Sequence, residues 1–161
     1  MIRAAVPDDA EEIARVHVTA WSETYRGLLA DDVIDSYTVA RRRERWERIL
    51  TQEAPGAATF VAEADGQIIG FASTLPQRNP DMRPVAEGEI AALYLLSSYH
   101  RQGFGTALWH ACLTELRRMG WGRATFEVHR GNAAAIAFYD AQGAEFHMPA
   151  DADHLIYTVA L

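Results

Sequence analysis

Lysine is absent from the 161-residue sequence, so all 15 basic residues are arginine. A phosphate-binding loop of the GxxxxGK[ST] type needs a lysine ammonium group, and enzymes that form a Schiff base with a substrate or with pyridoxal phosphate need a lysine amine. The composition therefore excludes these classes of enzyme.

Cysteine is almost absent as well, since Cys112 is the only one. A single cysteine can form neither an internal disulfide nor a thiolate metal cluster, and the six histidines show no HExxH spacing. We therefore expect no metal site. Apolar runs of about 20 residues, the length that spans a bilayer, are also missing, and the first ten residues lack the apolar core of a signal peptide. These absences predict a cytoplasmic protein without a membrane partner.

Negative charge is in excess, with 22 acidic residues against 15 basic ones and a net charge of −7. A protein that binds nucleic acid neutralises phosphates with a basic surface, so this balance argues against a nucleic-acid partner and favours a cationic one. The length corresponds to about one domain, and 49% hydrophobic residues suffice for a core. We expect a single domain over residues 1–161.

Short apolar segments alternate with helical patterns along the chain, which predicts one α/β (α+β) layer structure. The Asp65-Gly66 pair between two apolar runs predicts a tight hairpin, and the prolines of 76–88 predict a loop that could overhang a site. Strands are expected over 2–5, 58–64, 67–75, 89–96, 123–129 and 154–161. Helices are expected from Pro7-Asp8 with a capping-box-like Glu11, from Thr38, from the glycines near 103 to Met119, and over 132–142. The prediction is a mostly antiparallel mixed sheet of six or seven strands with about four helices.

A glycine loop joins the strand 89–96 to the following helix in the segment EIAALYLLSSYHRQGFGTAL, residues 89–108. Gly103 and Gly105 leave backbone amides uncovered, and the first amides of a helix are unpaired and carry a positive dipole end. Such a loop suits a phosphate or pyrophosphate. A Rossmann site would need a third glycine where Leu108 stands, so pyrophosphate without nicotinamide fits better.

A second segment, NAAAIAFYDAQG over residues 132–143, follows the strand TFEVH. On a helix, Asn132, Ile136 and Tyr139 share one face, which then carries an amide, an aliphatic group and a phenol. A capping Asn and a half-buried core Tyr would explain the same pattern by packing alone.

Together the two segments resemble the GNAT superfamily of acyl-CoA-dependent N-acyltransferases. HRQGFG matches its glycine motif at Gly103 and Gly105, although His100 stands where the family usually has Gln or Arg. NAAAIAFYDAQG matches the later segment at Asn132, Ala135, Ile136, Tyr139 and Gly143. The close likeness covers 89–143, about half of the chain.

The resemblance implies that acetyl-CoA is the acyl donor. Leu93, Tyr94 and Leu95 would hydrogen-bond pantetheine through their backbones where the strand separates from its neighbour, and Asn132 would contact the same arm. The pyrophosphate would be wrapped by the loop residues His100, Arg101, Gln102, Gly103, Phe104, Gly105 and Thr106.

Direct attack by an amine on the thioester needs no covalent enzyme intermediate. A primary amine has a pKa of about 10.4, so only about one part in a thousand is nucleophilic at neutral pH and a general base must remove the proton. By resemblance Glu89 is the candidate base, with Glu87 in reserve, and Tyr139 would protonate the leaving thiolate or hydrogen-bond it. An acyl-cysteine at Cys112 is disfavoured because this cysteine lies among apolar residues at helical spacing.

The acceptor, a small-molecule or peptide amine, would lie near the first two helices and the proline-rich loop. Trp21 and Tyr25 are the candidate substrate-binding residues, since aromatic rings suit an ammonium group, although core packing explains them equally well. Two other functions stay open: a non-catalytic acyl-CoA sensor or partner module on the same fold, and a nucleotide- or RNA-binding protein that uses the arginines of 41–48 and the glycine loop. The sequence leaves a monomer and a homodimer both open.

Overall fold

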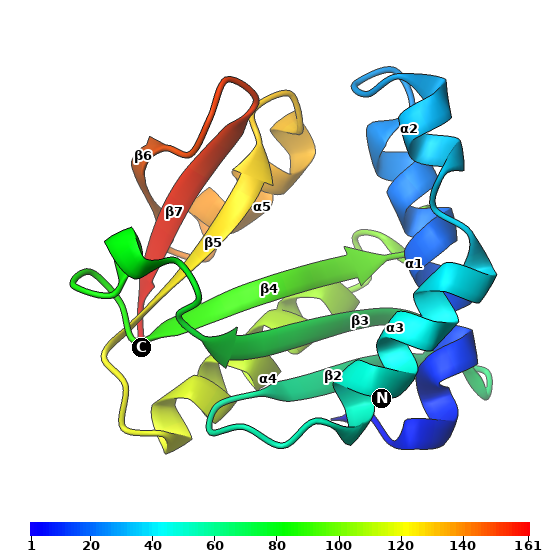
Figure 1. Cartoon of the computed structure of the whole chain (residues 1–161), viewed down its shortest axis with the longest axis horizontal. Helices are drawn as coiled ribbons and strands as arrows, with labels where there is room; N and C mark the ends of the chain where they lie inside the picture. Colours follow the sequence, from blue (N-terminus) through cyan, green and yellow to red (C-terminus); the bar gives the residue numbers. More distant parts are fainter.

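The computed structural model describes residues 1–161 as one seven-stranded sheet in the order β1-β2-β3-β4-β5-β7-β6, covered by helices on both faces (Figure 1). The strands are β1 Ile2–Ala4, β2 Ala58–Ala64, β3 Gln67–Pro76, β4 Gly88–Leu95, β5 Arg123–His129, β6 Glu145–Pro149 and β7 His154–Ala160. The α-helices are α1 Ala10–Tyr25, α2 Asp31–Asp35, α3 Val39–Thr51, α4 Phe104–Arg118 and α5 Ala133–Ala141. Short 3₁₀ turns occupy Pro7–Asp9, Pro80–Met82 and Ser97–Tyr99.

Neighbouring strands are antiparallel except for β4 and β5, which are parallel. The expected mixed sheet is therefore confirmed. The parallel pair arises because α4 connects β4 to β5, and a chain that crosses over through a helix returns in the same direction.

Two apolar cores lie on opposite faces of the sheet, because successive side chains of a strand point to opposite sides. Phe71 of β3 packs with Ile13 of α1 and Trp46 of α3, whereas its neighbour Ala72 packs with Trp109 of α4. Figure 1 shows α1 and α3 side by side and α4 behind the sheet. The face of the sheet turned toward α1 and α3 is called the acceptor face below.

Local sequence signals account for several element boundaries. Asp65 and Gly66 have φ values of 52° and 75°, as a tight hairpin between β2 and β3 requires. α3 begins directly after Thr38, as predicted, and the side chain of Thr38 accepts a hydrogen bond from Arg41 N there. The expected capping pair of Asp8 and Glu11 is wrong, because Asp9 instead accepts from Val6 N over 2.8 Å.

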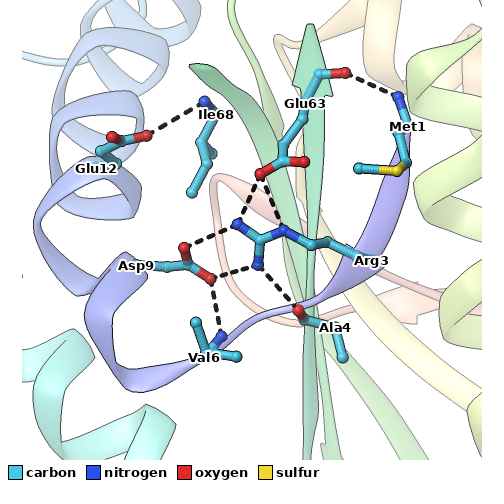
Figure 2. A network of polar contacts seen from close by, with 8 residues as sticks. All are labelled: Met1, Arg3, Ala4, Val6, Asp9, Glu12, Glu63 and Ile68. Atoms are coloured by element: carbon cyan, nitrogen blue, oxygen red, sulfur yellow. Dashed lines mark hydrogen bonds and ion pairs between the residues drawn. The ribbon is translucent and has the colours of Figure 1, made fainter. Parts of the chain in front are cut away.

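Arg3 joins the amino-terminal strand to the first helical turn (Figure 2). Its guanidinium donates two hydrogen bonds to Asp9, at 2.7 and 2.9 Å, and two to Oε1 of Glu63 on β2. These bonds raise the pKa of Arg3 and lower that of Asp9. The network fixes the start of α1 against the edge of the sheet.

Two elements were not anticipated, the short helix α2 and the strand β6. The sequence of β6, EFHMP, alternates polar and apolar residues over only four positions before Pro149, which is too short a run to separate a strand from a loop, and all five residues are exposed. The five residues of α2 are too few to establish a helical period. None of the helices combines the length and the apolar character needed to cross a bilayer.

Candidate functional site

β4 and β5 separate soon after they meet. Only Gly88–Ala124 and Glu89–Thr125 are paired, although both strands continue for several residues. A bulge at Ala91 of β4 accompanies the separation, since Ile90 and Ala92 pair with consecutive residues of β3. From the bulge onward β4 presents an edge to an opening instead of to β5, and such an edge can bind the amides of an extended ligand.

Leu93, Tyr94 and Leu95 lie on this opened part of β4, as the resemblance implied. They pair with Ala72, Phe71 and Gly70 of β3 on their other edge. The structure thus places all three where their backbones border the opening between β4 and β5.

The glycine loop follows β4 and leads directly into α4. Gly103 has a φ of +89° and is the residue before the helix, and the first helical hydrogen bond runs from Ala107 N to Gly103 O. The amides of Phe104, Gly105 and Thr106 therefore precede the hydrogen-bonded part of the helix and can receive an anion.

Gly105 is the second glycine of this loop and lies in the first turn of α4. A Cβ atom added at Gly105 would meet only the ring of Phe138, at 3.7 Å, which is ordinary contact. Packing within the protein therefore does not require glycine here, whereas close approach of a pyrophosphate to the backbone would. The residues present fit the phosphate end of a coenzyme A molecule.

Two polar side chains of the glycine loop form hydrogen bonds to backbone atoms that precede the loop. His100 Nε2 lies 2.9 Å from Leu95 O, and Gln102 Nε2 donates to Ser98 O over 3.1 Å. These two residues, expected to contact the ligand, thus position the loop against the end of β4. Arg101 has a φ of +62° and forms no ion pair, so its charge stays available to an anion.

Asn132 directly precedes α5, and Tyr139 lies near the end of the helix. Asn132 Oδ1 accepts from Ala135 N over 3.2 Å and so caps the helix, which leaves only its side-chain NH₂ group for a ligand. The ring of Tyr139 lies 4.3 Å from that of Phe126 on β5 and 5.3 Å from that of Trp109. Burial raises the pKa of Tyr139, so its phenol keeps its proton at neutral pH.

Glu89 lies where β4 and β5 begin to separate, and Arg78 holds it. Arg78 Nη2 and Nε donate to its two carboxylate oxygens over 2.6 and 3.1 Å, and Arg78 N donates to Oε2. Glu87, the reserve candidate, instead accepts from Gly122 and Arg123 N. Its pKa is lowered first by its own backbone amide and then by the amides of Arg123 and Gly122. Glu87 is thus an anchor for the start of β5.

A cavity of about 300 Å³ lies beside Glu89, and we call it the carboxylate cavity. It is lined by Gln77, Arg78, Asn79, Met82, Glu89, Thr125, Phe126, Glu127 and Ile156. The proline-rich loop forms one wall, as its composition predicted. Phe126 lines the cavity and also packs on Tyr139, which links this space to α5.

Glu127 and Arg78 were missed by sequence reasoning. In TFEVH the apolar Phe126 and Val128 point to the α4 core, so Glu127 must point to the acceptor face together with Glu89. The alternation in β5 could have revealed Glu127. Nothing local to the loop could have revealed the pairing of Arg78.

Trp21 and Tyr25, the predicted acceptor residues, lie in an aromatic group at the end of α1. Trp21 stacks on Tyr37 at 4.1 Å and lies 4.4 Å from Tyr25, measured between ring centroids. Tyr25 also lies 6.0 Å from His129 at the end of β5, and Trp21 lies 6.3 Å from Tyr94 on β4. Together these two rings therefore lie near both strands at the end of the opening that is remote from Glu89.

Cys112 lies on the buried face of α4, and burial raises the pKa of its thiol to about 12. A thiol in this state is not nucleophilic at neutral pH. A larger cavity of about 450 Å³, between α4 and the ends of α5 and β7, contains none of the predicted site residues.

Comparison with known proteins identifies the fold and its family. Residues 21–144 match the Acetyltransferase (GNAT) family. This chain belongs to the GNAT family. It is 32% identical over 145 residues to the uncharacterized N-acetyltransferase YuaI of Bacillus subtilis, covering 89% of this chain and 79% of YuaI. It is 24% identical to a spermidine N(1)-acetyltransferase of Thermoplasma acidophilum, covering 91% and 94% of the two chains.

Solved structures share the architecture of this GNAT protein. The PaiA N-acetyltransferase of Thermoplasma acidophilum, in complex with coenzyme A, superposes with a TM-score of 0.84 at 21% identity, over 100% of this chain and 98% of PaiA. The resemblance carried by the glycine loop and the α5 segment is thus confirmed, and the protein is an acyltransferase of the N-acetyltransferase type.

Proposed function

We propose that this enzyme transfers the acetyl group of acetyl-CoA to a primary amine by direct attack within a ternary complex. One observation carries the proposal: the opening between β4 and β5 separates an anion-binding loop at its α4 end from a cavity that contains Glu89 and Glu127. Donor and acceptor can therefore approach the same opening from different sides.

The donor would lie in the opening. The amides of residues 104–106 and the charge of Arg101 would bind the pyrophosphate, and the opened edge of β4 at Leu93–Leu95 would bind the pantetheine amides. The free NH₂ group of Asn132 would donate to a carbonyl of the same arm. These contacts would bring the thioester toward Tyr139.

The acceptor would enter from the acceptor face. Its nitrogen attacks the thioester carbonyl carbon, the C–N bond forms, and collapse of the tetrahedral intermediate breaks the C–S bond. The amine proton leaves to a cavity carboxylate, and the thiolate takes a proton or a hydrogen bond from Tyr139. A volume of about 300 Å³ suits a small amine or the end of a chain.

We assign proton removal to Glu89, acting through water because Arg78 occupies both of its oxygens. Glu127 is the second candidate, since it lines the same cavity without an ion-pair partner. Trp21 and Tyr25 would then border the acceptor at the end of the opening that is remote from Glu89.

Release of free CoA from acetyl-CoA, measured with a panel of amines, tests the proposal. Glu89→Gln, Glu127→Gln and Tyr139→Phe should each lower kcat, and the carboxylate whose removal abolishes the acidic limb of the pH profile is the base. A non-catalytic acyl-CoA sensor is the alternative: it would bind acetyl-CoA, turn over no amine and lose nothing in these three variants.

A further inference from the structure

The loop between β3 and β4 holds Arg78 in a defined place. Gln77, the residue before it, is buried, and its side-chain nitrogen donates to Gly88 O and to Thr125 Oγ1. The same side chain accepts from Asn79 N, the residue after Arg78. Hydrogen bonds to β4 and β5 thus fix the backbone on both sides of Arg78, and its guanidinium reaches into the carboxylate cavity.

Three charges line this cavity: Arg78, Glu89 and Glu127. Arg78 forms its ion pair with Glu89, and Glu127 adds a weaker favourable interaction that further raises the pKa of Arg78. The cavity therefore carries a net charge of −1. One ammonium group neutralises it, whereas a ligand with two ammonium groups leaves an excess positive charge.

The ion pair between Arg78 and Glu89 is only partly shielded from water. The side chain of Arg78 is 56% exposed and that of Glu89 is 17% exposed. Exposed ion pairs contribute little to the free energy of unfolding. We therefore attribute the role of Arg78 to the positive charge that it adds to the cavity and not to stability.

We propose that Arg78 is a specificity-determining residue that selects acceptors with a single ammonium group and disfavours diamines, by neutralising one of the two cavity carboxylates. This inference rests on the proposed function. It names a chemical class of acceptor: a primary amine whose remaining atoms in the cavity are uncharged. Removing Arg78 leaves a cavity with a net charge of −2, which suits a second ammonium group.

The test compares n-butylamine with 1,4-diaminobutane, which has the same four-carbon chain and a second amine. The measured quantity is the ratio of kcat/KM for the diamine to kcat/KM for the monoamine at saturating acetyl-CoA. We expect the ratio to rise about tenfold in Arg78→Gln, the effect of one added negative charge a few ångströms away at intermediate polarity. The double variant Arg78→Gln/Glu89→Gln restores a net charge of −1. Because it also lacks the assigned base, it is compared by equilibrium binding, and the ratio of its affinities for the two amines should return to the wild-type value.

Arg48→Gln is the control for charge, because Arg48 is exposed on α3 and does not line the cavity. Arg83 on the same loop is unsuitable, since its Nε donates to Gln77 O next to Arg78. Arg48→Gln changes the total charge of the protein equally and should leave the ratio unchanged. Equal shifts in Arg78→Gln and Arg48→Gln, or a double variant whose ratio of affinities does not return to the wild-type value, would overturn the proposal. A loss of turnover in Arg78→Gln confined to acceptors that bear a carboxylate would also overturn it, by making Arg78 a direct ligand of that group.

Equilibrium binding separates this inference from the proposed function. Both amines are titrated into the CoA-loaded wild type, Arg78→Gln and the double variant, and binding is followed by NMR. If no amine is turned over but 1,4-diaminobutane binds Arg78→Gln about tenfold more tightly than it binds the other two proteins, the proposed function fails and the charge assignment holds. If the relative binding of the two amines is the same in all three proteins, the charge assignment is refuted and the proposed function is unaffected.

Discussion

The indole N–H of Trp46 donates to Nδ1 of His17 over 3.1 Å and so joins α3 to α1 inside the apolar core. Because Nδ1 accepts this bond, it carries no proton, and the neutral ring holds its proton on Nε2. The same ring lies 5.1 Å from both Phe71 of β3 and Tyr94 of β4, measured between centroids. A neutral His17 therefore connects both helices to the strands that carry the site.

Acid should weaken the fold through His17. Burial, aided by the charges of Arg42 and Arg45, lowers its pKa from 6.5 to about 3. Below pH 6.5 His17 is protonated in the unfolded chain but stays neutral in the folded protein. The free energy of unfolding therefore falls by about 1.4 kcal/mol for each pH unit between pH 6.5 and about 3. The contribution is fully present above pH 6.5.

Urea unfolding at pH 7 and pH 5 measures this effect against His17→Asn, which does not titrate. The loss of unfolding free energy between the two pH values should be about 2 kcal/mol smaller in the variant. Equal losses in both proteins would show that the fold does not lower the pKa of His17.

Gly105→Ala should separate ligand binding from folding. The added methyl group has room against Phe138, so the melting temperature should hold or rise, by an amount equivalent to at most about 1 kcal/mol. The KM for acetyl-CoA should rise by about tenfold or more, because the methyl group would cover the amides that face the pyrophosphate. Gly120→Ala, at a φ of +75° just after α4, should do the opposite and lower stability by about 1 kcal/mol with KM unchanged.

Tyr139→Phe should lower kcat by about a hundredfold and leave the KM for acetyl-CoA nearly unchanged. The ring contacts with Phe126 and Trp109 survive, so stability should be retained. Because burial raises the pKa of Tyr139, the phenol keeps its proton beyond pH 10, and ionisation of Tyr139 should not lower the wild-type kcat up to that pH. A pH profile of kcat for both proteins checks the assignment, and an unchanged kcat in the variant would refute it.

Asp9→Asn should destabilise the fold more than Glu63→Gln, although both carboxylates pair with Arg3. Asp9 also accepts from Val6 N, and its side chain is 11% exposed against 21% for Glu63. We expect losses of about 2 and about 1 kcal/mol, measured by urea unfolding at pH 7. Acetyl transfer should persist in both variants, since the network lies away from the opening between β4 and β5. A larger loss in Glu63→Gln would mean that the hydrogen bond from Val6 N to Asp9 contributes little.

The amino-acid sequence by itself determined the features that depend on neighbouring residues. The hairpin at Asp65-Gly66, the cap at Thr38 and the positive φ of Gly103 follow from which backbone conformations and local hydrogen bonds each residue favours. The glycine loop and the α5 segment, both short and continuous, also sufficed to indicate the GNAT family and an acyl-CoA donor.

Only the tertiary structure decided what surrounds the reacting groups. Arg78 meets Glu89, and Glu127 joins them, because β4 and β5 are adjacent in the sheet and the loop before β4 folds back over them. Strand order and the point at which two strands separate depend on how α4 and α1 pack on opposite faces of the sheet. That packing involves contacts throughout the core. A local pattern can therefore identify a candidate base such as Glu89, but which partner holds that carboxylate depends on contacts between distant parts of the chain.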